Sequence, residues 1–464
     1  MIEGLPPYQA YRDAGLGWLA DVPEHWTQRR LKTLLRERVE KGFPDEPLLA
    51  ATQTKGVVLK EDYENRTVLA LKDLHLLKLV RDGDFVVSLR SFQGGIEYAR
   101  VQGIISPAYT VLHPVDPATH SYIAALFKSK PFVENLSLFV TGIRQGQNID
   151  YEALSRSEIP LPPPEEQEAI VRFLDHADRR IRRYIAAKQR LIKLLEEQKQ
   201  AIIQRAVTRG LDPNVRLKPS GVEWLGDIPE HWEVKRLKYL FREVDKRTKT
   251  GEEVLLSLRM YQGLVPHEDV STVPIPPAAR IGFKQVVPGQ MVMNRMRAAI
   301  GLFGVPTQAG LVSPDYAVFQ PTRGVSPEFY LRLFKTQRAA TEFRIESKGL
   351  GTGSSGFMRL YSDRFGIISA PYPPLQEQLA LAEGISDLTL EIDHTLARLH
   401  GELALVREYR TRLIADVVTG KLDVRGVELP DLGYDEDVVD VEIEGEELDE
   451  LGGEIAEEEE ALAL

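Results

Sequence analysis

The sequence predicts an α+β protein in which two mixed α/β domains are separated by two long helices that pack antiparallel as a coiled coil. The whole is expected to form a pseudo-twofold internal repeat. Three observations predict this fold. One unit of about 210 residues occurs twice, each copy ends in a long heptad pattern, and each middle alternates short β-rich runs with Gly and Pro breaks.

Each copy opens on the same segment. GLGWLADVPEHWTQRRLKTLLRE, starting at Gly15, aligns with GVEWLGDIPEHWEVKRLKYLFRE, starting at Gly221, and fourteen of the 23 positions are identical at an offset of 206. The shared aromatic residues are expected to pack in cores, and neither shared histidine has a Ser or Asp pattern for catalysis beside it. We therefore expect structural roles for Trp18, Trp26, His25 and their counterparts Trp224, Trp232 and His231.

The two middles, about residues 38–158 and 244–369, differ far more than the opening segments. They share only islands: GDFVVSLR with GQMVMNRM, SPAYTV with SPDYAV, and ALFKS with RLFKT. A helical stretch around SYIAALFKSKPFVENL matches one around PEFYLRLFKTQRAATEF. The middles are therefore expected to be mixed α/β domains that share some elements and differ in most of their sequence.

Each copy closes on a proline run followed by a long helix. PLPPPEEQEAI from Pro160 aligns with PYPPLQEQLAL from Pro371 at an offset of 211. Glu166 and Glu377 suit the positive helix start, and Gly210 and Gly420 suit the stops. A helix of about 40 residues would span roughly 60 Å. The period of 3.5 predicts a coiled-coil seam, formed by Leu174, Asp178, Ile181, Ile185, Lys188, Ile192, Leu195, Lys199 and Ile202 in the first copy and Ala382, Ile385, Thr389, Ile392, Leu396, Leu399, Leu403, Val406, Arg410 and Leu413 in the second.

The expected domains follow these boundaries. They are a first reader with its opening segment (1–158), a first spacer helix (159–210), a second reader (211–369), a second spacer helix (370–425) and an acidic tail (426–464). Residues 431–464 hold 16 acidic and no basic residues, which predicts disorder. Residues 1–430 hold 58 basic and 53 acidic residues, a net charge of +5 that permits a nucleic-acid partner.

Composition and motifs argue against several classes. The chain has no cysteine, its nine histidines lack ligand spacing, and no apolar run is long enough to span a membrane, so a cytoplasmic protein without a metal site is expected. No phosphate-binding loop occurs. SPAY and SPDY lack the second proline of a methyltransferase (D/N)PP(Y/F) motif. Asp315, Glu346 and Lys348 match a nuclease PD…ExK pattern only loosely.

The duplicated constant parts closely resemble the specificity subunit of type I restriction-modification systems. The resemblance rests on WL(A/G)D(V/I)PEHW with (R/K)RLK, the proline run ending in EQ, and the heptad helix ending TxxLD, and it covers about residues 8–425. It implies that each middle is a target recognition domain for one half of a bipartite double-stranded DNA target. It also implies a non-catalytic chain that docks two methyltransferase subunits, which bind S-adenosylmethionine, and restriction subunits, which use ATP and magnesium.

DNA reading requires Arg, Lys, Asn or Gln near base edges, beside small polar residues and glycines that allow close approach. The candidate stretches lie in both middles, and the alternative for each is an ordinary solvated loop. The candidates in the first middle are Ser88, Arg90, Ser91, Gln93, Thr141, Arg144, Gln145, Gln147 and Asn148. Those in the second are Arg259, Tyr261, Gln262, Asn294, Arg295, Arg297, Lys348, Thr352, Ser354, Ser355 and Arg359.

Two alternatives stay open. The chain could be an orphan coiled-coil scaffold that binds DNA or protein without a methyltransferase partner, or it could carry a fused nuclease or methyltransferase activity. A cluster of arginines on the first helix could meet phosphates or a partner subunit, or form a plain solvated face. This cluster consists of Arg179, Arg180, Arg182 and Arg183.

Overall fold

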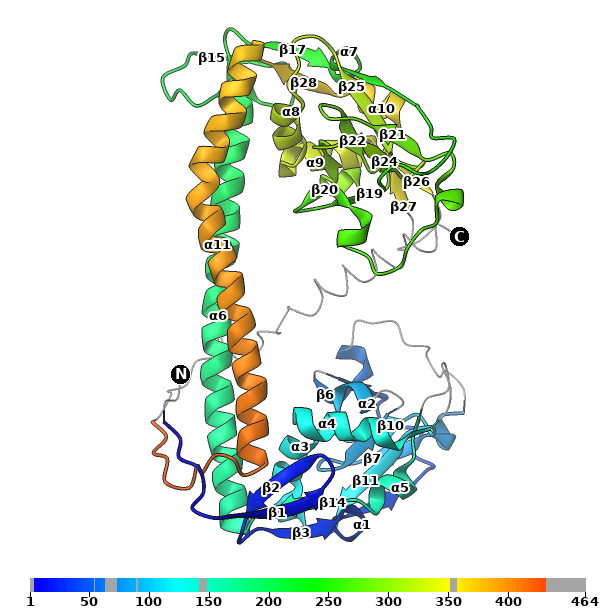
Figure 1. Ribbon diagram of the computed structural model, residues 1–464, viewed down its shortest axis with the longest axis vertical. Helices are drawn as coiled ribbons and strands as arrows, with labels where there is room; N and C mark the ends of the chain where they lie inside the picture. Colours follow the sequence, from blue (N-terminus) through cyan, green and yellow to red (C-terminus); the bar gives the residue numbers. More distant parts are fainter. Residues whose placement is uncertain are drawn as a thin grey trace. The chain divides into compact units, whose positions relative to one another are not determined.

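The computed structural model describes residues 4–53, 55–62, 73–88, 91–141, 148–350 and 357–430 (Figure 1). The acidic tail from residue 431 lies outside these residues. The described chain forms two compact units. The first unit combines the residues up to Ala187 with those from Gly401 onward, and the second runs from Lys188 to His400. Each unit therefore takes part of both long helices, and the first unit joins two separate segments of the chain whereas the described part of the second is consecutive.

The first unit is built around a four-stranded antiparallel sheet in the order β4-β11-β8-β9. Short two-stranded pairs surround it: β1-β2, β3-β14, β5-β6, β7-β10 and β12-β13. The strands are β1 (Tyr11–Leu16), β2 (Leu19–Pro23), β3 (Thr27–Arg30), β4 (Leu35–Arg38), β5 (Leu49–Thr52), β6 (Gly56–Leu59), β7 (Lys78–Val80), β8 (Phe85–Val87), β9 (Glu97–Tyr98), β10 (Gly103–Ile105), β11 (Thr110–Pro114), β12 (Val140–Thr141), β13 (Asn148–Ile149) and β14 (Glu158–Leu161). The helices before the long one are α1 (Leu31–Leu34), α2 (Ser91–Gly94), α3 (His120–Phe127), α4 (Lys130–Leu136) and α5 (Tyr151–Ser155).

The second unit repeats this topology. Its central sheet has the order β18-β25-β22-β23, and the pairs β17-β28, β19-β20, β21-β24 and β26-β27 recur in the same places. Its strands are β15 (Leu217–Pro219), β16 (Asp227–Pro229), β17 (Glu233–Arg236), β18 (Phe241–Glu243), β19 (Leu256–Arg259), β20 (Gly263–Pro266), β21 (Lys284–Val286), β22 (Met291–Met293), β23 (Phe303–Gly304), β24 (Gly310–Val312), β25 (Ala317–Pro321), β26 (Lys348–Leu350), β27 (Phe357–Arg359) and β28 (Ser369–Tyr372). Its shorter helices are α7 (Leu237–Leu240), α8 (Pro327–Phe334), α9 (Gln337–Glu346) and α10 (Ser362–Ile367).

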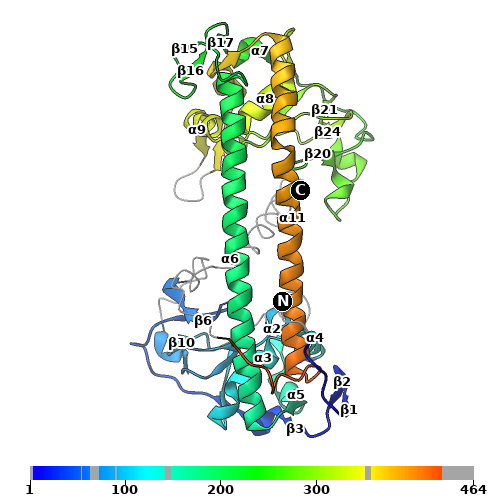
Figure 2. The ribbon, with the colours of Figure 1, turned by 90° about the vertical axis from the view of Figure 1, so that its left-hand side faces the viewer.

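The two long helices are α6 (Pro164–Arg209) and α11 (Leu375–Val418), and they lie next to each other in both views (Figures 1 and 2). They run antiparallel, because contacts that move forward along α6 move backward along α11. In the first unit Asp178 meets Arg410 and Tyr184 meets Glu402. The predicted seam is confirmed, since every seam position is buried or half-buried. Gly210 and Gly420 follow the helix ends with φ of 77° and 79°, as predicted.

The proline run and its glutamine start each long helix. Gln167 and Gln378 are buried, and each side-chain amide donates to a proline carbonyl five residues earlier at 2.8 Å. Gln378 also accepts a hydrogen bond from the Ser326 backbone nitrogen at 2.8 Å, which fixes the helix start to the domain. The repeated PP…EQ motif therefore joins each spacer helix to its own reader.

Each opening segment contributes a tryptophan to the core of its unit, and that core also contains residues of both long helices. Trp26 and Trp232 are buried in the cores of the first and second units, as expected. The first core includes the end of α11 (Leu413, Val417, Val418), and the second includes the end of α6 (Ile203, Ala206, Val207). Each domain is therefore closed by the start of its own helix and the end of the other.

The helical stretch predicted in each middle consists of two short helices. The first is divided into α3 and α4 at Lys128 and Ser129, and the second into α8 and α9 at Lys335 and Thr336. The Thr336 side chain accepts a hydrogen bond from the Ala339 nitrogen and so starts α9 as its N-cap. Ser129 and Thr336 each also donate to a carbonyl three residues back, at 2.7 Å.

Candidate nucleic-acid interface

A β-hairpin with an exposed tip stands out in the second unit. Strands β19 and β20 are joined by Met260, Tyr261 and Gln262, and Gly263 follows with a φ of 72°. Tyr261 is 86% exposed, Gln262 is exposed, and Arg259 at the end of β19 is half-buried. The hairpin thus gathers three of the predicted residues, with a large aromatic ring and an amide at its tip.

The loop after β22 lies close to this hairpin. Asn294 is buried, and its side-chain oxygen accepts hydrogen bonds from the backbone nitrogens of Met296 and Arg297 at 3.0 and 3.2 Å. Asn294 therefore shapes the turn that presents Arg297, which is half-buried. Beyond them Gly301 adopts a φ of 81°.

Arg295 and Arg359 belong to an ion-pair network with two carboxylates. The Arg295 guanidinium lies 2.7 Å from the Glu243 carboxylate and donates to the Asp315 carbonyl at 3.3 Å. Arg359 pairs with the Asp315 carboxylate at 2.5 Å. Lys348, exposed on β26, lies opposite Arg359 in the β26-β27 register. These side chains therefore form a second group in the same unit.

The first unit presents an equivalent hairpin, β5-β6. The Gln53 side chain at its tip donates to the side-chain oxygen of Gln93 at 3.2 Å, and both residues are exposed. Ser88 and Ser91 are buried, and their hydroxyl oxygens lie 3.3 Å apart. Sequence reasoning found Gln93 but missed Gln53, although the alignment of the two hairpins would have shown it.

The remaining candidates of the first unit lie largely outside the described residues. Thr141 and Asn148 belong to the backbone of the paired strands β12 and β13. Seven other candidates of the two units lie outside the described residues, namely Arg90, Arg144, Gln145, Gln147, Thr352, Ser354 and Ser355.

Lys128 in the first unit and Lys335 in the second each donate to a hairpin carbonyl, and neither was among the predicted site residues. The Lys335 ammonium donates to the Met260 carbonyl at 3.0 Å, and burial, with Arg332 and Lys199 nearby, lowers its pKa. The Lys128 ammonium donates to the Gln53 carbonyl at 3.1 Å. The shared islands ALFKS and RLFKT carried the signal that could have found both residues.

Lys128 also pairs with a buried carboxylate. Its ammonium lies 2.7 Å from Glu97, which is 1% exposed, and donates to the Gly94 carbonyl at 2.9 Å. Burial outweighs the attraction of Lys128 and raises the pKa of Glu97 to about 7. The Lys128 ammonium group therefore contacts the tip of the β5-β6 hairpin, the Gly94 carbonyl and the buried Glu97 carboxylate.

The SPxY motifs are structural turns. The backbone nitrogens of Tyr109 and Tyr316 donate to the carbonyls of Ser106 and Ser313, both at 3.1 Å. Lys78 and Lys284 donate to the Tyr109 and Tyr316 carbonyls at 2.8 and 2.7 Å. Burial lowers the pKa of Lys284. The same anchored turn in both units accounts for the shared SPxY letters.

The carboxylates of the loose nuclease pattern have separate partners. Asp315 pairs with Arg359, and Glu346 pairs with Arg364. Within the described part of the chain, no group of three His, Asp or Glu residues is placed to hold a metal ion. None of the described helices is both long and apolar enough to cross a membrane.

The shared histidines hold the helix starts. His25 and His231 each place Nε2 at 2.8 Å from a glutamate in the first turn of a long helix, Glu166 and Glu377 respectively. In the second unit Trp232 also donates to Glu377 at 3.0 Å. The PEHW motif therefore fixes each helix start to the opening segment, which agrees with the structural role expected for it.

Part of the arginine cluster on α6 forms ion pairs and hydrogen bonds with residues of the long helices. Arg182 and Arg410 both lie 2.6 Å from the Asp178 carboxylate, and Arg179 donates to the Asp175 carbonyl at 3.3 Å. Arg180 is exposed. The polar seam residue Asp178 thus joins the two helices through charge.

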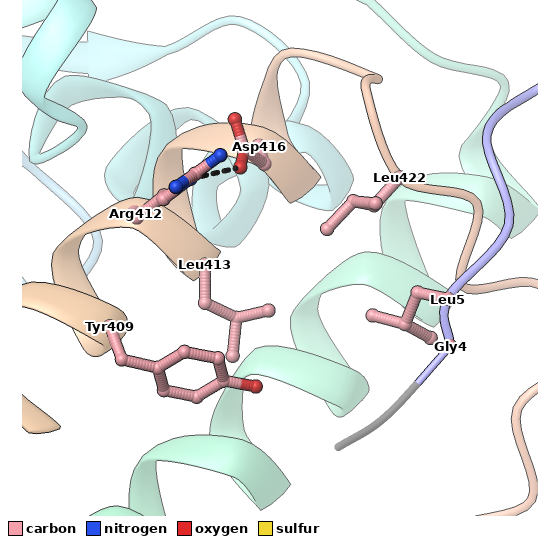
Figure 3. Close-up of a pocket in the computed structure, with 7 residues that line it drawn as sticks. All are labelled: Gly4, Leu5, Tyr409, Arg412, Leu413, Asp416 and Leu422. Carbon is pink, nitrogen blue, oxygen red and sulfur yellow. Dashed lines mark ion pairs between the residues drawn. The ribbon is translucent and has the colours of Figure 1, made fainter. Parts of the chain in front are cut away.

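A shallow pocket lies where the N-terminal segment meets the end of α11 (Figure 3). Leu5, Leu413 and Leu422 line it, and Arg412 pairs with Asp416 at its edge, 3.5 Å apart. Its lining is mainly apolar, so it offers little of the chemistry that recognises bases or phosphates.

Comparisons with known proteins agree with this architecture. The family described as type I restriction modification DNA specificity domain matches residues 45–194. A type I restriction enzyme MjaX specificity subunit of Methanocaldococcus jannaschii is 23% identical over 88% of this chain and 96% of its own length. The MjaVIII specificity subunit of the same organism is 23% identical over 60% of this chain and 65% of its own length.

A solved structure supports the fold. It concerns complex assembly and conformational transition of a type I restriction-modification system, and one of its chains matches with a TM-score of 0.59 at 16% identity, covering 86% of this chain and 99% of the other. The MjaX specificity subunit and this solved structure match over most of the chain, and the family model matches residues 45–194. Residues 45–194 therefore match the type I restriction modification DNA specificity domain, and the chain is similar over most of its length to a specificity subunit of a type I restriction enzyme.

Proposed function

We propose that this chain reads an asymmetric bipartite DNA sequence, with one half-site for each unit. The observation that carries the proposal is the pair of equivalent hairpins, β5-β6 and β19-β20, which share backbone pairing but not their tips. One tip offers Gln53 and Lys55, and the other offers Tyr261 and Gln262. Two like frames with unlike tips suit a target whose half-sites differ.

The chemistry of the tips suits base edges. A glutamine amide can bond adenine at two positions in the major groove, an arginine can do the same for guanine, and an apolar surface contacts the thymine methyl group. Gln93, Gln262 and Tyr261 are exposed and offer such groups to a duplex, and Arg259 and Arg297 are half-buried guanidinium groups of the second unit. We assign them to base reading or its immediate surroundings.

The other candidates fall into three groups. Ser88, Ser91 and Asn294 are buried, so we assign them to loop shape rather than DNA contact. Arg295 and Arg359 would have to leave carboxylate partners to reach a base, which costs energy. The exposed Lys348 suits a phosphate, and the candidates outside the described residues remain predictions.

We infer that two methyltransferase subunits dock on the long helices. Leu194 on α6 and Leu405 on α11 are 56% and 67% exposed and lie at equivalent positions of the repeat, since the offset of the closing segments is 211. An exposed leucine at the same place in both copies suits two copies of one partner. Leu191, one turn before Leu194, extends the apolar surface in the second unit.

The proposed assembly assigns the cofactors to the partners. S-adenosylmethionine would bind the methyltransferase subunits, and ATP with magnesium would serve restriction subunits. Acting on genomic DNA with these partners, the chain would work in the cytoplasm.

A domain exchange tests the proposal. The chain is expressed with its methyltransferase partner, and N6-methyladenine is mapped across a host genome for the natural chain and for one whose residues 244–369 come from another specificity subunit. We expect a bipartite methylated motif in which the exchange alters one half and keeps the other. Absence of methylation with a co-purifying methyltransferase, or a change in both halves, would refute the modular reading.

A further inference from the structure

The feature that the proposed function leaves unexplained is the lysine shared by ALFKS and RLFKT. Lys128 follows the end of α3, and Lys335 follows the end of α8. Lys128 donates to the carbonyl of Gln53 and Lys335 to that of Met260. Strands β5 and β6 correspond to β19 and β20 with a shift of 207, so both lysines bind the first loop residue of the equivalent hairpin.

The same helix end also meets the loop that carries other candidate DNA contacts. A side chain added at Gly95 would come within 2.4 Å of the Phe127 carbonyl oxygen, and one at Gly301 within 3.3 Å of the Phe334 carbonyl oxygen. Both glycines have positive φ, 86° and 81°. Each lysine therefore stands where the hairpin tip and the neighbouring loop converge, in two domains whose sequences otherwise differ.

We propose that Lys128 and Lys335 are positioning residues that set the geometry of the DNA-reading hairpins, and so determine how well each unit discriminates its half-site. This inference rests on the proposed function. The ammonium group acts on a backbone carbonyl, so it fixes where the tip lies without depending on which side chains the tip carries. A donor of this kind can remain in place while the tips diverge.

A purely stabilising role would predict something different. Within the described part of the chain no carboxylate pairs with Lys335, which is half-buried, and burial lowers the pKa of its ammonium group. A residue selected for stability alone would be better replaced by an apolar side chain at such a place. A charged donor aimed at the hairpin carbonyl fits positioning instead.

The hydrogen bonds that Lys128 and Lys335 donate to the hairpins are equivalent, but only Lys128 also pairs with a buried carboxylate. Glu97, which pairs with Lys128, lies opposite Val86 in the central sheet, and the equivalent position opposite Val292 in the second unit is Gly304. Lys335→Met therefore removes a hydrogen bond without leaving a buried carboxylate behind. Lys128→Met would orphan Glu97, so it is made together with Glu97→Gln.

The test uses the complete specificity subunit assembled with its methyltransferase partner. Methylation kcat/KM is measured on duplexes that carry the full target, a mismatch in the first half-site, or a mismatch in the second. For Lys335→Met we expect discrimination at the second half-site to fall about tenfold, the scale of losing one base-reading contact, while discrimination at the first stays unchanged. Lys128→Met with Glu97→Gln should show the reverse pattern, and Lys335→Arg, which keeps a donor, should restore discrimination.

A second measurement reports on the hairpin itself. Hydrogen exchange of residues 259–263 should become faster in Lys335→Met, while exchange in the central sheet β18-β25-β22 stays the same. Should Lys335→Met not fold, Lys335→Leu, which also lacks a donor, is measured in its place. Unchanged discrimination ratios, or equal losses at both half-sites, would overturn the positioning role. If the natural chain itself failed to discriminate by half-site, the proposed function would fall instead.

Discussion

Glu97→Gln tests the buried pair beneath the first reading hairpin. Glu97 is 1% exposed, and burial raises the pKa of its carboxyl from 4.5 to about 7 despite the adjacent Lys128. A group whose folded pKa is raised contributes stability that is present below its unfolded pKa and lost as the pH rises through the folded pKa. The window of loss here runs from about pH 4.5 to about pH 7. Because a tenfold change in proton affinity corresponds to about 1.4 kcal/mol, the loss is on the order of 3 kcal/mol.

The amide in Glu97→Gln does not titrate, so the variant should lack this loss. The free energy of local unfolding is measured by native-state hydrogen exchange in β8 and β11 at several pH values across the window. Relative to the natural chain, the variant should gain stability as the pH rises from 4.5 to 7. Glu134→Gln, an exposed change in the same unit, is the control and should leave the profile unaltered. Parallel profiles for Glu97→Gln and the natural chain would mean that Lys128 keeps Glu97 ionised and that burial does not dominate.

Two further predictions concern the partner surface and the core. Leu194→Asp should remove one docked methyltransferase subunit and Leu405→Asp the other, with the double variant losing both, as measured by native mass spectrometry of the assembled complex; retention of two subunits by the double variant would refute docking at these leucines. Trp232→Ala should destabilise the second unit by about 3–5 kcal/mol, the usual cost of truncating a fully buried tryptophan, while Trp26→Ala does the same to the first. Urea unfolding with exchange mass spectrometry separates the units, and a loss below about 1 kcal/mol would show that the site collapses around the missing ring.

The constant parts of the fold could be predicted because they repeat. The offset of 211 and the 3.5-residue period located both long helices and their glycine stops, and the burial of the seam agrees with that prediction. What the pattern could not give is how the units are composed. The chain leaves the first domain along α6 and returns along α11, so each core includes residues such as Val207 or Val418 from the helix of the other copy. In the first unit this packing depends on contacts far apart in the sequence, such as the hydrogen bond from Tyr122 to the Val418 carbonyl across 296 residues, which local periodicity does not encode.

The candidate site was harder to predict for a different physical reason. Sequence chemistry selected Ser88, Asn294 and Tyr261 by the same criterion, their hydrogen-bonding side chains. The fold separates them: Ser88 and Asn294 are buried in turns, and Tyr261 stands 86% exposed on a hairpin tip. Lys335 was overlooked because it donates to a backbone carbonyl. Every residue has such a carbonyl, so the sequence does not show which one the lysine contacts. Comparing the two copies would have found it, since the lysine persists where its surroundings change.

The separation of frame and tip has an energetic consequence. Substituting exposed loop residues away from special features usually changes stability by no more than about 0.5 kcal/mol, whereas truncating buried aromatic residues costs several kcal/mol. Gln262 and Tyr261 can therefore vary with little effect on folding, while Trp232 cannot. A tether such as that of Lys335, which holds a backbone carbonyl, keeps its geometry through such changes. If the hairpin tips read DNA, a new half-site can arise from a few tip substitutions in one unit, without altering the other unit or the helices that join them.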